Sequence, residues 1–349
     1  MSVFSSIAFD DHERVVFCRD RSVGLSAIIA IHSTVLGPSA GGTRQWSYAN
    51  DDEALYDVLR LSQGMSYKNA MAGLNFGGGK AVIMQTPEFK ASDALYKRFG
   101  DFVESLSGDY ITAEDVGMSP QIMQTIASRT RYVTGLPTTG GKACGDPSPK
   151  TAFGIFRGIE AAVRFKLERE DLTGTSVAVQ GVGNVGYQLC RLLHDAGATL
   201  TVADIDQAKV RRVCDEFGAS AVPLDEILFS DVDLLAPCAL GAILTEDSIP
   251  RLRAKIVAGA ANNQLQTPDD GQRLADADIL YAPDYVINGG GIINVACEYS
   301  GEADDSGVMD LVTQIGPRLM GIFEESASSG KLTNVIADEQ ARRIIAAGR

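Results

Sequence analysis

The sequence predicts an α/β protein with two domains, one of them built on a doubly wound parallel sheet. The chain has 349 residues, and roughly 150 residues is the usual share of one domain. Strand-like and helix-like segments alternate along the first part of the chain, which is typical of α/β folds. Near the middle, a short apolar segment runs into a glycine-rich turn and then a helix-like segment, as in a doubly wound sheet.

The first part of the chain contains recognisable strands and one long helix. "SAIIAIHST" (26–34) is short and β-branched, so it predicts a buried strand, and "GPSAGGTR" (37–44) predicts a glycine-rich loop. Apolar residues at helical spacing behind an acidic start predict a helix over about residues 52–70. "KAVIMQ" (80–85) and "DYITAED" (109–115) predict two more strands, with Lys80 just before one and Asp115 just after the other.

The composition changes at about residue 135, where "GLPTTGGKACGDPSPKTA" (135–152) is rich in Gly, Pro and Thr. Such a segment is typical of a loop or hinge between domains, and its prolines disfavour an ordinary helix. We therefore predict a boundary here, followed by a helix in "TAFGIFRGIEAAVRF" (151–165) and then by the second domain.

The second domain opens with a dinucleotide-binding pattern. The apolar run 177–179 is followed by Gly181-Val182-Gly183-Asn184-Val185-Gly186, which matches G-x-G-x-x-G before a helix-like run. The glycines allow a tight turn, a close approach of the pyrophosphate and helix–strand packing. The next strand ends in Asp204, an acid placed to bind ribose hydroxyls, which favours NAD over NADP. A glycine-rich turn that binds nothing is the alternative.

The composition excludes several classes of protein. With 31 basic and 45 acidic residues, the net charge of −14 opposes binding to nucleic acid or to anionic membranes. The N-terminus lacks a signal-peptide pattern and no apolar run has the roughly 18 residues of a membrane span, so we expect a cytoplasmic protein. The six cysteines show no C-x-x-C spacing and the three histidines no metal-ligand spacing, so no metal site is expected. Acid–base chemistry then falls to Lys, Asp or Glu.

The segment "GLNFGGGKAV" (73–82) places three glycines against Lys80. It is not a P-loop, because that motif needs Gly and Ser or Thr at the positions of Leu74 and Ala81. If Lys68 and Lys80 face one cleft, repulsion and partial desolvation lower the pKa of one of them, which then serves as a base. Asp115 is a candidate proton carrier. Solvated surface lysines and a helix cap at Asp115 are the alternatives.

The chain also contains, in this order, the segments "GPSAGGTR", "GMSYKNAMAGLNFGGGKAV", "AEDVG", "GDPSPKTA", "QGVGNVG", "APCALG", "GAANNQL" and "YAPDYVINGGGIINVA". Over roughly residues 10 to 330, this series resembles the leucine, phenylalanine and valine dehydrogenases of the glutamate dehydrogenase superfamily. The resemblance implies a substrate-binding and oligomerisation domain (1–135, completed by 326–349) and a Rossmann NAD-binding domain (136–325). The active site would lie in the cleft between them.

The resemblance also implies roles for individual residues. Lys68 would bind the substrate carboxylate, Lys80 would be the general base that activates water, and Asp115 would exchange a proton with the substrate nitrogen. Gly41 and Asn262 match positions that contact the substrate backbone. The positions matching the cofactor side are Arg44, Thr151, Gly181, Val182, Gly183, Asn184, Val185, Gly186, Asp204, Cys238, Ala239, Ala260, Asn262 and Asn288.

The implied reaction is the reversible, NAD-dependent oxidative deamination of an apolar L-amino acid to its 2-oxo acid, with release of ammonium. The positions that match the side-chain pocket are small or apolar: Ala40, Ala113, Thr134, Ile292 and Val295. Ala40 leaves room for a larger substrate and Ile292 favours a smaller one, while one methylene is worth only about 1–3 kcal/mol. Branched-chain substrates such as leucine or valine are favoured, and phenylalanine or tryptophan is the alternative.

Two further expectations follow from the resemblance. A homo-oligomer built from dimers through the N-terminal domain is expected, although the chain ends sooner than leucine-type members do. A catalytically silent NAD-binding sensor is the remaining alternative. It predicts the loss of the base or the proton carrier, yet Lys68, Lys80 and Asp115 are all present.

Overall fold

The computed structural model describes residues 3–136, 146–301 and 304–348. The chain divides into two compact units. Unit 1 comprises 1–145, 295–303 and 341–349, and unit 2 comprises 146–294 and 304–340. The predicted domain bounds of 1–135 with 326–349, and of 136–325, remain a prediction. Half of the predicted hinge 135–152, Cys144 included, lies outside the described residues.

Unit 1 is built on a five-stranded sheet of order β1-β2-β4-β3-β5. Its elements are η1 (Val3–Ser5), β1 (Arg14–Asp20), β2 (Leu25–Ser33), β3 (Ser39–Trp46), α1 (Asp51–Ala72), β4 (Gly77–Met84), α2 (Asp93–Ser105), β5 (Tyr110–Glu114) and α3 (Pro120–Ala127). The β1/β2 and β2/β4 pairs are antiparallel, whereas β3 runs parallel to both β4 and β5. The sheet therefore brings the end of β5 close to β4 with only β3 between them.

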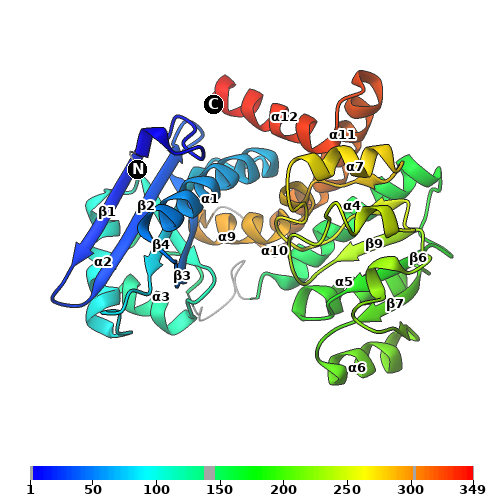
Figure 1. Ribbon diagram of the computed structural model, residues 1–349, viewed down its shortest axis with the longest axis horizontal. Helices are drawn as coiled ribbons and strands as arrows, with labels where there is room; N and C mark the ends of the chain where they lie inside the picture. Colours follow the sequence, from blue (N-terminus) through cyan, green and yellow to red (C-terminus); the bar gives the residue numbers. More distant parts are fainter. Residues whose placement is uncertain (1–2, 137–145, 302–303, 349) are drawn as a thin grey trace. The chain divides into compact units, whose positions relative to one another are not determined.

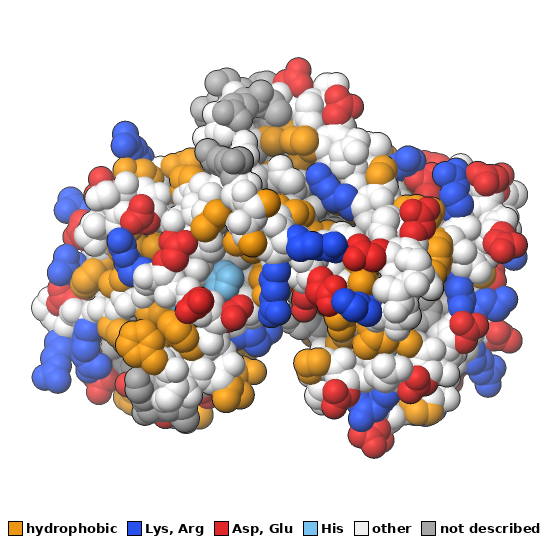
Figure 2. Space-filling view, turned by 90° about the horizontal axis from the view of Figure 1, so that it is seen from above, with side chains coloured by type: hydrophobic (Ala, Val, Ile, Leu, Met, Phe, Trp, Pro, Cys, Tyr) orange, Lys and Arg blue, Asp and Glu red, His pale blue; other side chains and the backbone are white. Residues whose placement is uncertain are grey.

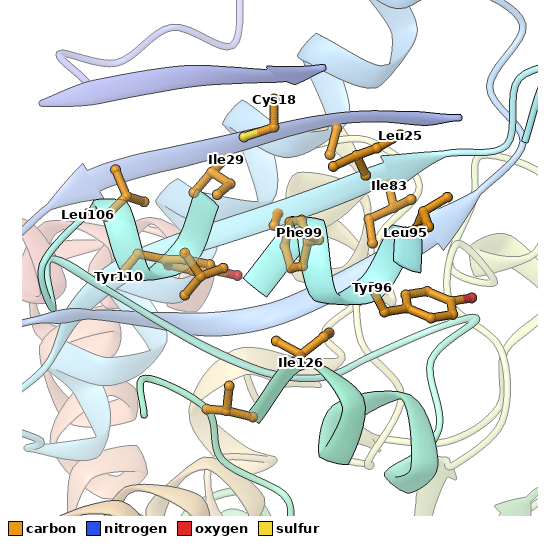
Figure 3. Close-up of a cluster of buried hydrophobic side chains, with 14 of the residues drawn as sticks. Cys18, Leu25, Ile29, Ile83, Leu95, Tyr96, Phe99, Leu106, Tyr110 and Ile126 are labelled. Carbon is orange, nitrogen blue, oxygen red and sulfur yellow. The ribbon is translucent and has the colours of Figure 1, made fainter. Parts of the chain in front are cut away.

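The strands of unit 1 are buried on both faces of the sheet. Alternate residues of β2 and β4, such as Ile28 and Val82, pack against α1, while Ile29 and Ile83 pack against α2 and α3. Figure 3 shows this second cluster, with Phe99 of α2 lying among the side chains of the strands. Because side chains alternate along a strand, Lys80 shares the face of Val82, which α1 covers.

Helix α1 begins and ends where the sequence signals indicate. The Asn50 side chain accepts a hydrogen bond from the backbone of Glu53 at its start, and three acidic residues occupy the first turn, which suits the positive end of the helix dipole. It ends at Gly73 in the left-handed conformation (φ 71°), which glycine adopts without steric cost.

Two predictions for unit 1 are wrong. Segment 37–44 is not a loop, because most of it forms β3, where glycine is extended and allows close packing: a Cβ on Gly41 would lie 1.8 Å from the carbonyl oxygen of Gly79. Lys80 does not precede its strand but lies inside β4. The glycines 77–79 belong to that strand, and its neighbours approach too closely for a Cβ at these positions.

Unit 2 is a doubly wound α/β unit on a parallel six-stranded sheet of order β11-β10-β9-β6-β7-β8. Its strands are β6 (Ser176–Gln180), β7 (Thr199–Ala203), β8 (Ser220–Ala221), β9 (Leu234–Pro237), β10 (Ile256–Val257) and β11 (Leu280–Tyr281). The strand order reverses between β6 and β9, the point where such sheets bind ligands. The predicted α/β fold with a doubly wound sheet is confirmed (Figure 1).

The helices of unit 2 begin with α4, before the first strand of the sheet, and continue between and after the strands. They are α4 (Ser148–Leu167), α5 (Asn184–Asp195), α6 (Gln207–Phe217), η2 (Ile227–Phe229), η3 (Ile249–Arg251), α7 (Asp269–Asp276), α8 (Asp284–Ile287), α9 (Gly290–Ser300), α10 (Asp305–Thr313), α11 (Ile315–Ser329) and α12 (Thr333–Ala347). The division into units passes through α9 and α12. In the described part of the chain, no helix has the length and apolar character to cross a membrane.

Candidate active site

The buried Lys80 and the half-buried Asp115 form an ion pair in unit 1. The Nζ atom of Lys80, on β4, lies 2.6 Å from Oδ2 of Asp115, which follows β5. The two strands are not neighbours, because β3 lies between them. Gly42 of β3 leaves the room for this approach: a Cβ at that position would lie 2.9 Å from the Asp115 Cβ.

The glycines before Lys80 bring α1 and β4 together. A Cβ on Gly78 would lie 2.0 Å from the backbone nitrogen of Ser66 on α1. One on Gly79 would lie 2.7 Å from the hydroxyl of Ser39. Lys68, half-buried, follows Ser66 on the same helix. The glycine run therefore holds the helix that carries Lys68 against the strand that carries Lys80.

Burial and neighbouring charges set the electrostatics of the pair. Burial lowers the pKa of Lys80, Asp115 opposes this effect, and the positive charge of Arg44 reinforces it. Burial raises the pKa of Asp115, but the charges of Lys80 and Arg44 and a hydrogen bond from the Val116 backbone more than offset it, leaving the pKa below its usual value. The sequence suggested Lys68 as the neighbouring cation, which remains a prediction, whereas Arg44 acts on Lys80 in the structure.

Arg44 and Asp57 extend the pair into a network that the sequence analysis missed. Arg44, predicted on the cofactor side, lies in unit 1 with Nε 3.4 Å from Asp115 Oδ2 and Nη1 3.0 Å from Asp57 Oδ2. Asp57 was in no predicted set. The available signal was helical spacing, because Asp57 precedes Lys68 on α1 by about three turns and so shares its face.

The predicted pocket residues of unit 1 lie on adjacent segments. Ala40 and Gly41 of β3 pair with Ile111 and Thr112 of β5, which lie two residues and one residue before Ala113. The buried Thr134 donates its backbone N–H to the carbonyl of Thr112. The structure thus gathers these four positions on the β5 side of the sheet. On α9, Val295 belongs to unit 1 and Ile292 to unit 2, and both are half-buried.

The glycine loop of unit 2 joins β6 to α5, and its three glycines differ in what surrounds them. A Cβ on Gly181 (φ 91°) would lie 2.7 Å from the Ala239 Cβ, and one on Gly186 would lie 2.0 Å from the Gly181 carbonyl oxygen. A Cβ on Gly183 would meet nothing within 4 Å. Packing therefore requires the first and third glycines but not the second, whose open side suits the approach of a ligand to the N-terminus of α5.

Asp204 orients this loop. Its Oδ2 accepts a hydrogen bond from the Val182 backbone nitrogen at 2.7 Å, and its Oδ1 accepts one from Asp206 at 2.8 Å. Ile205 beside it is 85% exposed, an apolar surface residue at the rim of the loop that the sequence analysis did not single out. The carboxylate keeps lone pairs for a ribose hydroxyl.

Other predicted cofactor-side residues meet at the ends of β9 and β10. The Asn288 Nδ2 donates to the Ala260 carbonyl at 3.0 Å and to the Asn262 side-chain oxygen at 2.7 Å. Its own Oδ1 is buried without a partner among the described residues, so it can accept from an amide such as a carboxamide. Cys238 and Ala239 follow β9 beside Gly181. The side chain of Thr151 binds the Pro147 carbonyl on α4.

Several alternatives can be judged from the described residues. The cap of α3 is Ser119, so Asp115 is not a helix cap, and Lys80 is not a solvated surface lysine.

His12 and His32 are buried under α1, bonded to Ser62 and Ser66, and burial lowers the pKa of each. Cys18, Cys190 and Cys297 are buried. Within the described ranges, no cluster of His, Cys, Asp or Glu is arranged to hold a metal.

The chain resembles known proteins over nearly its whole length. Residues 12–132 match the family model described as Glu/Leu/Phe/Val dehydrogenase, dimerisation domain. Residues 201–310 match the one described as Glutamate/Leucine/Phenylalanine/Valine dehydrogenase. Leucine dehydrogenase of Geobacillus stearothermophilus is 47% identical over 99% of this chain and 94% of its own. Valine dehydrogenase of Streptomyces virginiae is 50% identical over 83% and 82%. The crystal structure of L-tryptophan dehydrogenase from Nostoc punctiforme superposes with a TM-score of 0.87, at 45% identity, over 97% and 96%.

Proposed function

Because this chain belongs to the Glu/Leu/Phe/Val dehydrogenase family, we propose that it catalyses the reversible oxidative deamination of an apolar L-amino acid with NAD. An amino acid, NAD⁺ and water give a 2-oxo acid, ammonium, NADH and a proton. The observation that carries the proposal is the ion pair of the buried Lys80 with Asp115, with Nζ and Oδ2 2.6 Å apart. A silent sensor would not need a base and a proton carrier in contact.

Lys80 is the general base of the proposed reaction. Its neutral amine takes a proton from the water that adds to the imino acid, and the buried position that lowers its pKa makes that form accessible. Asp115 exchanges a proton with the substrate nitrogen, and Lys68 binds the substrate carboxylate as a fixed cation. In this scheme α1 carries the residue that binds the carboxylate, β4 carries the general base, and the proton carrier follows β5.

NAD, when bound, supplies the hydride acceptor. The residues of unit 2 suit it: the open side of Gly183 and the N-terminus of α5 would face the pyrophosphate, and Asp204 the ribose hydroxyls. The buried, unpartnered Oδ1 of Asn288 would accept from the carboxamide. Replacing Asp204 by Asn is expected to weaken NAD binding by about tenfold to a hundredfold, because a charged hydrogen bond is worth about 1.5–3 kcal/mol. An unchanged affinity in calorimetric titration would argue against the ribose contact.

The substrate we propose is a branched-chain aliphatic amino acid, with leucine or valine as the preferred member. Relatives named leucine dehydrogenase and valine dehydrogenase support this choice. An aromatic amino acid is the second candidate, because Ala40 is small and a relative of similar identity is named L-tryptophan dehydrogenase. None of the positions that match the family's side-chain pocket carries a charged residue, which disfavours glutamate: Ala40, Ala113, Thr134, Ile292 and Val295.

The test is the rate of NADH formation with purified protein, NAD and each of Leu, Val, Ile, Met, Phe, Tyr, Trp, Ala and Glu at alkaline pH. A maximum among Leu, Val and Ile supports the proposal, and a maximum at Phe or Trp supports the second candidate. No turnover with any of these amino acids, while NAD still binds in a calorimetric titration, would point to the sensor instead.

We further propose a homo-oligomer that forms through unit 1. The family model matched by residues 12–132 is described as a dimerisation domain. In addition, β1 is an edge strand with Phe17 58% exposed, which is the kind of strand that pairs with another chain. Light scattering with size-exclusion chromatography gives the mass. A monomer at micromolar concentration would contradict the proposal, and Phe17→Asp is expected to weaken assembly.

A further inference from the structure

Asp57 of α1 is a carboxylate with three side-chain partners and a place next to the predicted catalytic pair. Its Oδ2 accepts from the Tyr48 hydroxyl at 2.8 Å and from Arg44 Nη1 at 3.0 Å. Its Oδ1 accepts from Arg60 Nη2 at 3.1 Å. The Asp57 side chain is 15% exposed. Hydrogen bonds of this kind offset the cost of removing a carboxylate from water.

The guanidinium of Arg44 is divided between two carboxylates. Its Nη1 binds Asp57 at 3.0 Å, and only its Nε approaches Asp115, at 3.4 Å. An arginine beside a single carboxylate commonly binds it with two parallel hydrogen bonds. Because Asp57 binds Nη1 of Arg44, the guanidinium does not form two hydrogen bonds with Asp115. Asp115 therefore keeps its short 2.6 Å contact with Lys80.

This division matters because Asp115 has to gain and lose a proton. A fully paired Arg–Asp contact strongly favours the charged carboxylate, which would hinder protonation of Asp115. Arg44 already lowers the pKa of Asp115 and of Lys80, while the negative charge of Asp57 raises the pKa of Lys80. The groups that face this network are Lys80 on β4, Arg44 on β3, Tyr48 after β3, Arg60 on α1 and Tyr110 on β5.

We propose that Asp57 is a positioning residue: it holds Arg44 so that Asp115 remains the partner of Lys80 and can exchange a proton. In that exchange an N–H bond of the substrate breaks and an O–H bond forms on Asp115, and the reverse step restores both. The catalytic meaning of this arrangement rests on the proposed function, whereas the effect of Asp57 on Asp115 is a property of the free protein.

The direct test is the titration of Asp115 in the ligand-free protein. Aspartate labelled with ¹³C at the side-chain carboxyl gives one signal per residue, and Asp115→Asn identifies the relevant one. In Asp57→Asn, Arg44 loses its competing carboxylate and turns to Asp115, so the midpoint of Asp115 is expected to fall by about one pH unit. An unchanged midpoint would overturn the inference.

Asp101→Asn is the matched control. Asp101 also binds two arginines, Arg98 and Arg129, in unit 1, but nothing in its contacts reaches Asp115. Its replacement is expected to leave the Asp115 midpoint unchanged. The control shows whether the Asp115 midpoint responds to the loss of any aspartate that binds two arginines or specifically to the loss of Asp57.

A double-mutant cycle with Arg44→Gln shows whether Asp57 acts through Arg44. With Arg44 absent, Asp57→Asn removes only a more distant charge, so its effect on the Asp115 midpoint is expected to shrink to a small fraction. An equal shift in both backgrounds would mean a direct field of Asp57 and would refute a positioning role. If Asp57→Asn does not fold, Tyr48→Phe removes one hydrogen bond from Asp57 and is expected to shift the midpoint in the same direction, by less.

The rate profile separates this inference from the proposed function. With the best substrate, Asp57→Asn is expected to shift the pH profile of kcat/KM and to lower kcat. Wild-type turnover with no shift of the Asp115 signal in Asp57→Asn would sustain the proposed function and refute the inference. If Asp57→Asn shifts the Asp115 signal but the wild-type protein turns over none of the amino acids, the inference would be sustained and the proposed function refuted.

Discussion

Gly42 and Asp115 lie so close that a methyl group on the glycine would be 2.9 Å from the Cβ of the aspartate. The same added Cβ would lie 2.8 Å from the carbonyl oxygen of Glu114. Gly42 is on β3, the strand between the two that carry Lys80 and lead to Asp115. The ion pair therefore depends on a residue that takes no part in the chemistry.

Gly42→Ala is expected to displace Asp115 and to lower kcat by at least about tenfold, with a loss of stability of roughly 1–3 kcal/mol from overpacking. Steady-state kinetics and thermal unfolding measure the two effects. Gly64→Ala is the control, because a Cβ on that exposed helical glycine meets nothing within 4 Å and is expected to stabilise the helix slightly. Wild-type kcat in Gly42→Ala would contradict the packing argument.

Lys80→Ala is expected to reduce turnover by about 10²–10⁴-fold, the usual contribution of a general base. NAD binding is expected to stay nearly unchanged, because the glycine loop belongs to unit 2 and Lys80 to unit 1. Calorimetric titration with NAD and steady-state kinetics measure the two properties. The exposed Lys97 of α2 supplies a control, Lys97→Ala. Comparable activity in Lys80→Ala would refute its role as the base.

The pH dependence of deamination follows from the lowered pKa of Lys80. The neutral amine is the active base, so kcat/KM is expected to rise with pH and to level off below the usual lysine value of about 10.4. Asp115 opposes the lowering, so Asp115→Asn is expected to move the midpoint to still lower pH while reducing the maximal rate. A midpoint that moves upward in this variant would contradict the assignment.

The three glycines of the 181–186 loop are expected to respond differently to alanine. Gly183→Ala places a Cβ in open space, so the protein is expected to keep its melting temperature and to lose NAD affinity by tenfold or more. Gly181→Ala is the contrasting variant, because its φ of 91° and its contact with Ala239 predict a loss of stability. Melting curves with and without NAD measure both properties. Full NAD affinity in Gly183→Ala would refute the approach of the pyrophosphate at that residue.

The distribution of charge on the protein surface can be related directly to the amino-acid composition, whereas the arrangement of charges in the candidate site cannot. Figure 2 shows acidic and basic side chains interspersed on the face in view rather than gathered by sign. The net charge of −14 is thus spread out on that face. Solubility is a matter of this overall balance, whereas the chemistry depends on a few charges that meet away from solvent.

Although the roles of Lys68, Lys80, Asp115 and Asp204 remain predictions, the sequence by itself predicted the α/β class, the limits of α1 and the glycine loop before α5. These features are local: capping residues, helical spacing and a glycine pattern act over a few neighbouring positions. Their physical causes can be read without knowing which strands pair, and that is why the predictions for these elements agree with the structure.

Only the tertiary structure decided which charges meet. The order β4-β3-β5 brings Lys80 and Asp115 together across β3, and the packing of α1 on that face adds Asp57 and Arg44. The same packing makes 39–46 a strand rather than a loop, because its glycines are required by neighbouring backbone and not by a turn. Strand order and burial arise from contacts between distant segments, so no local pattern in this chain encodes them.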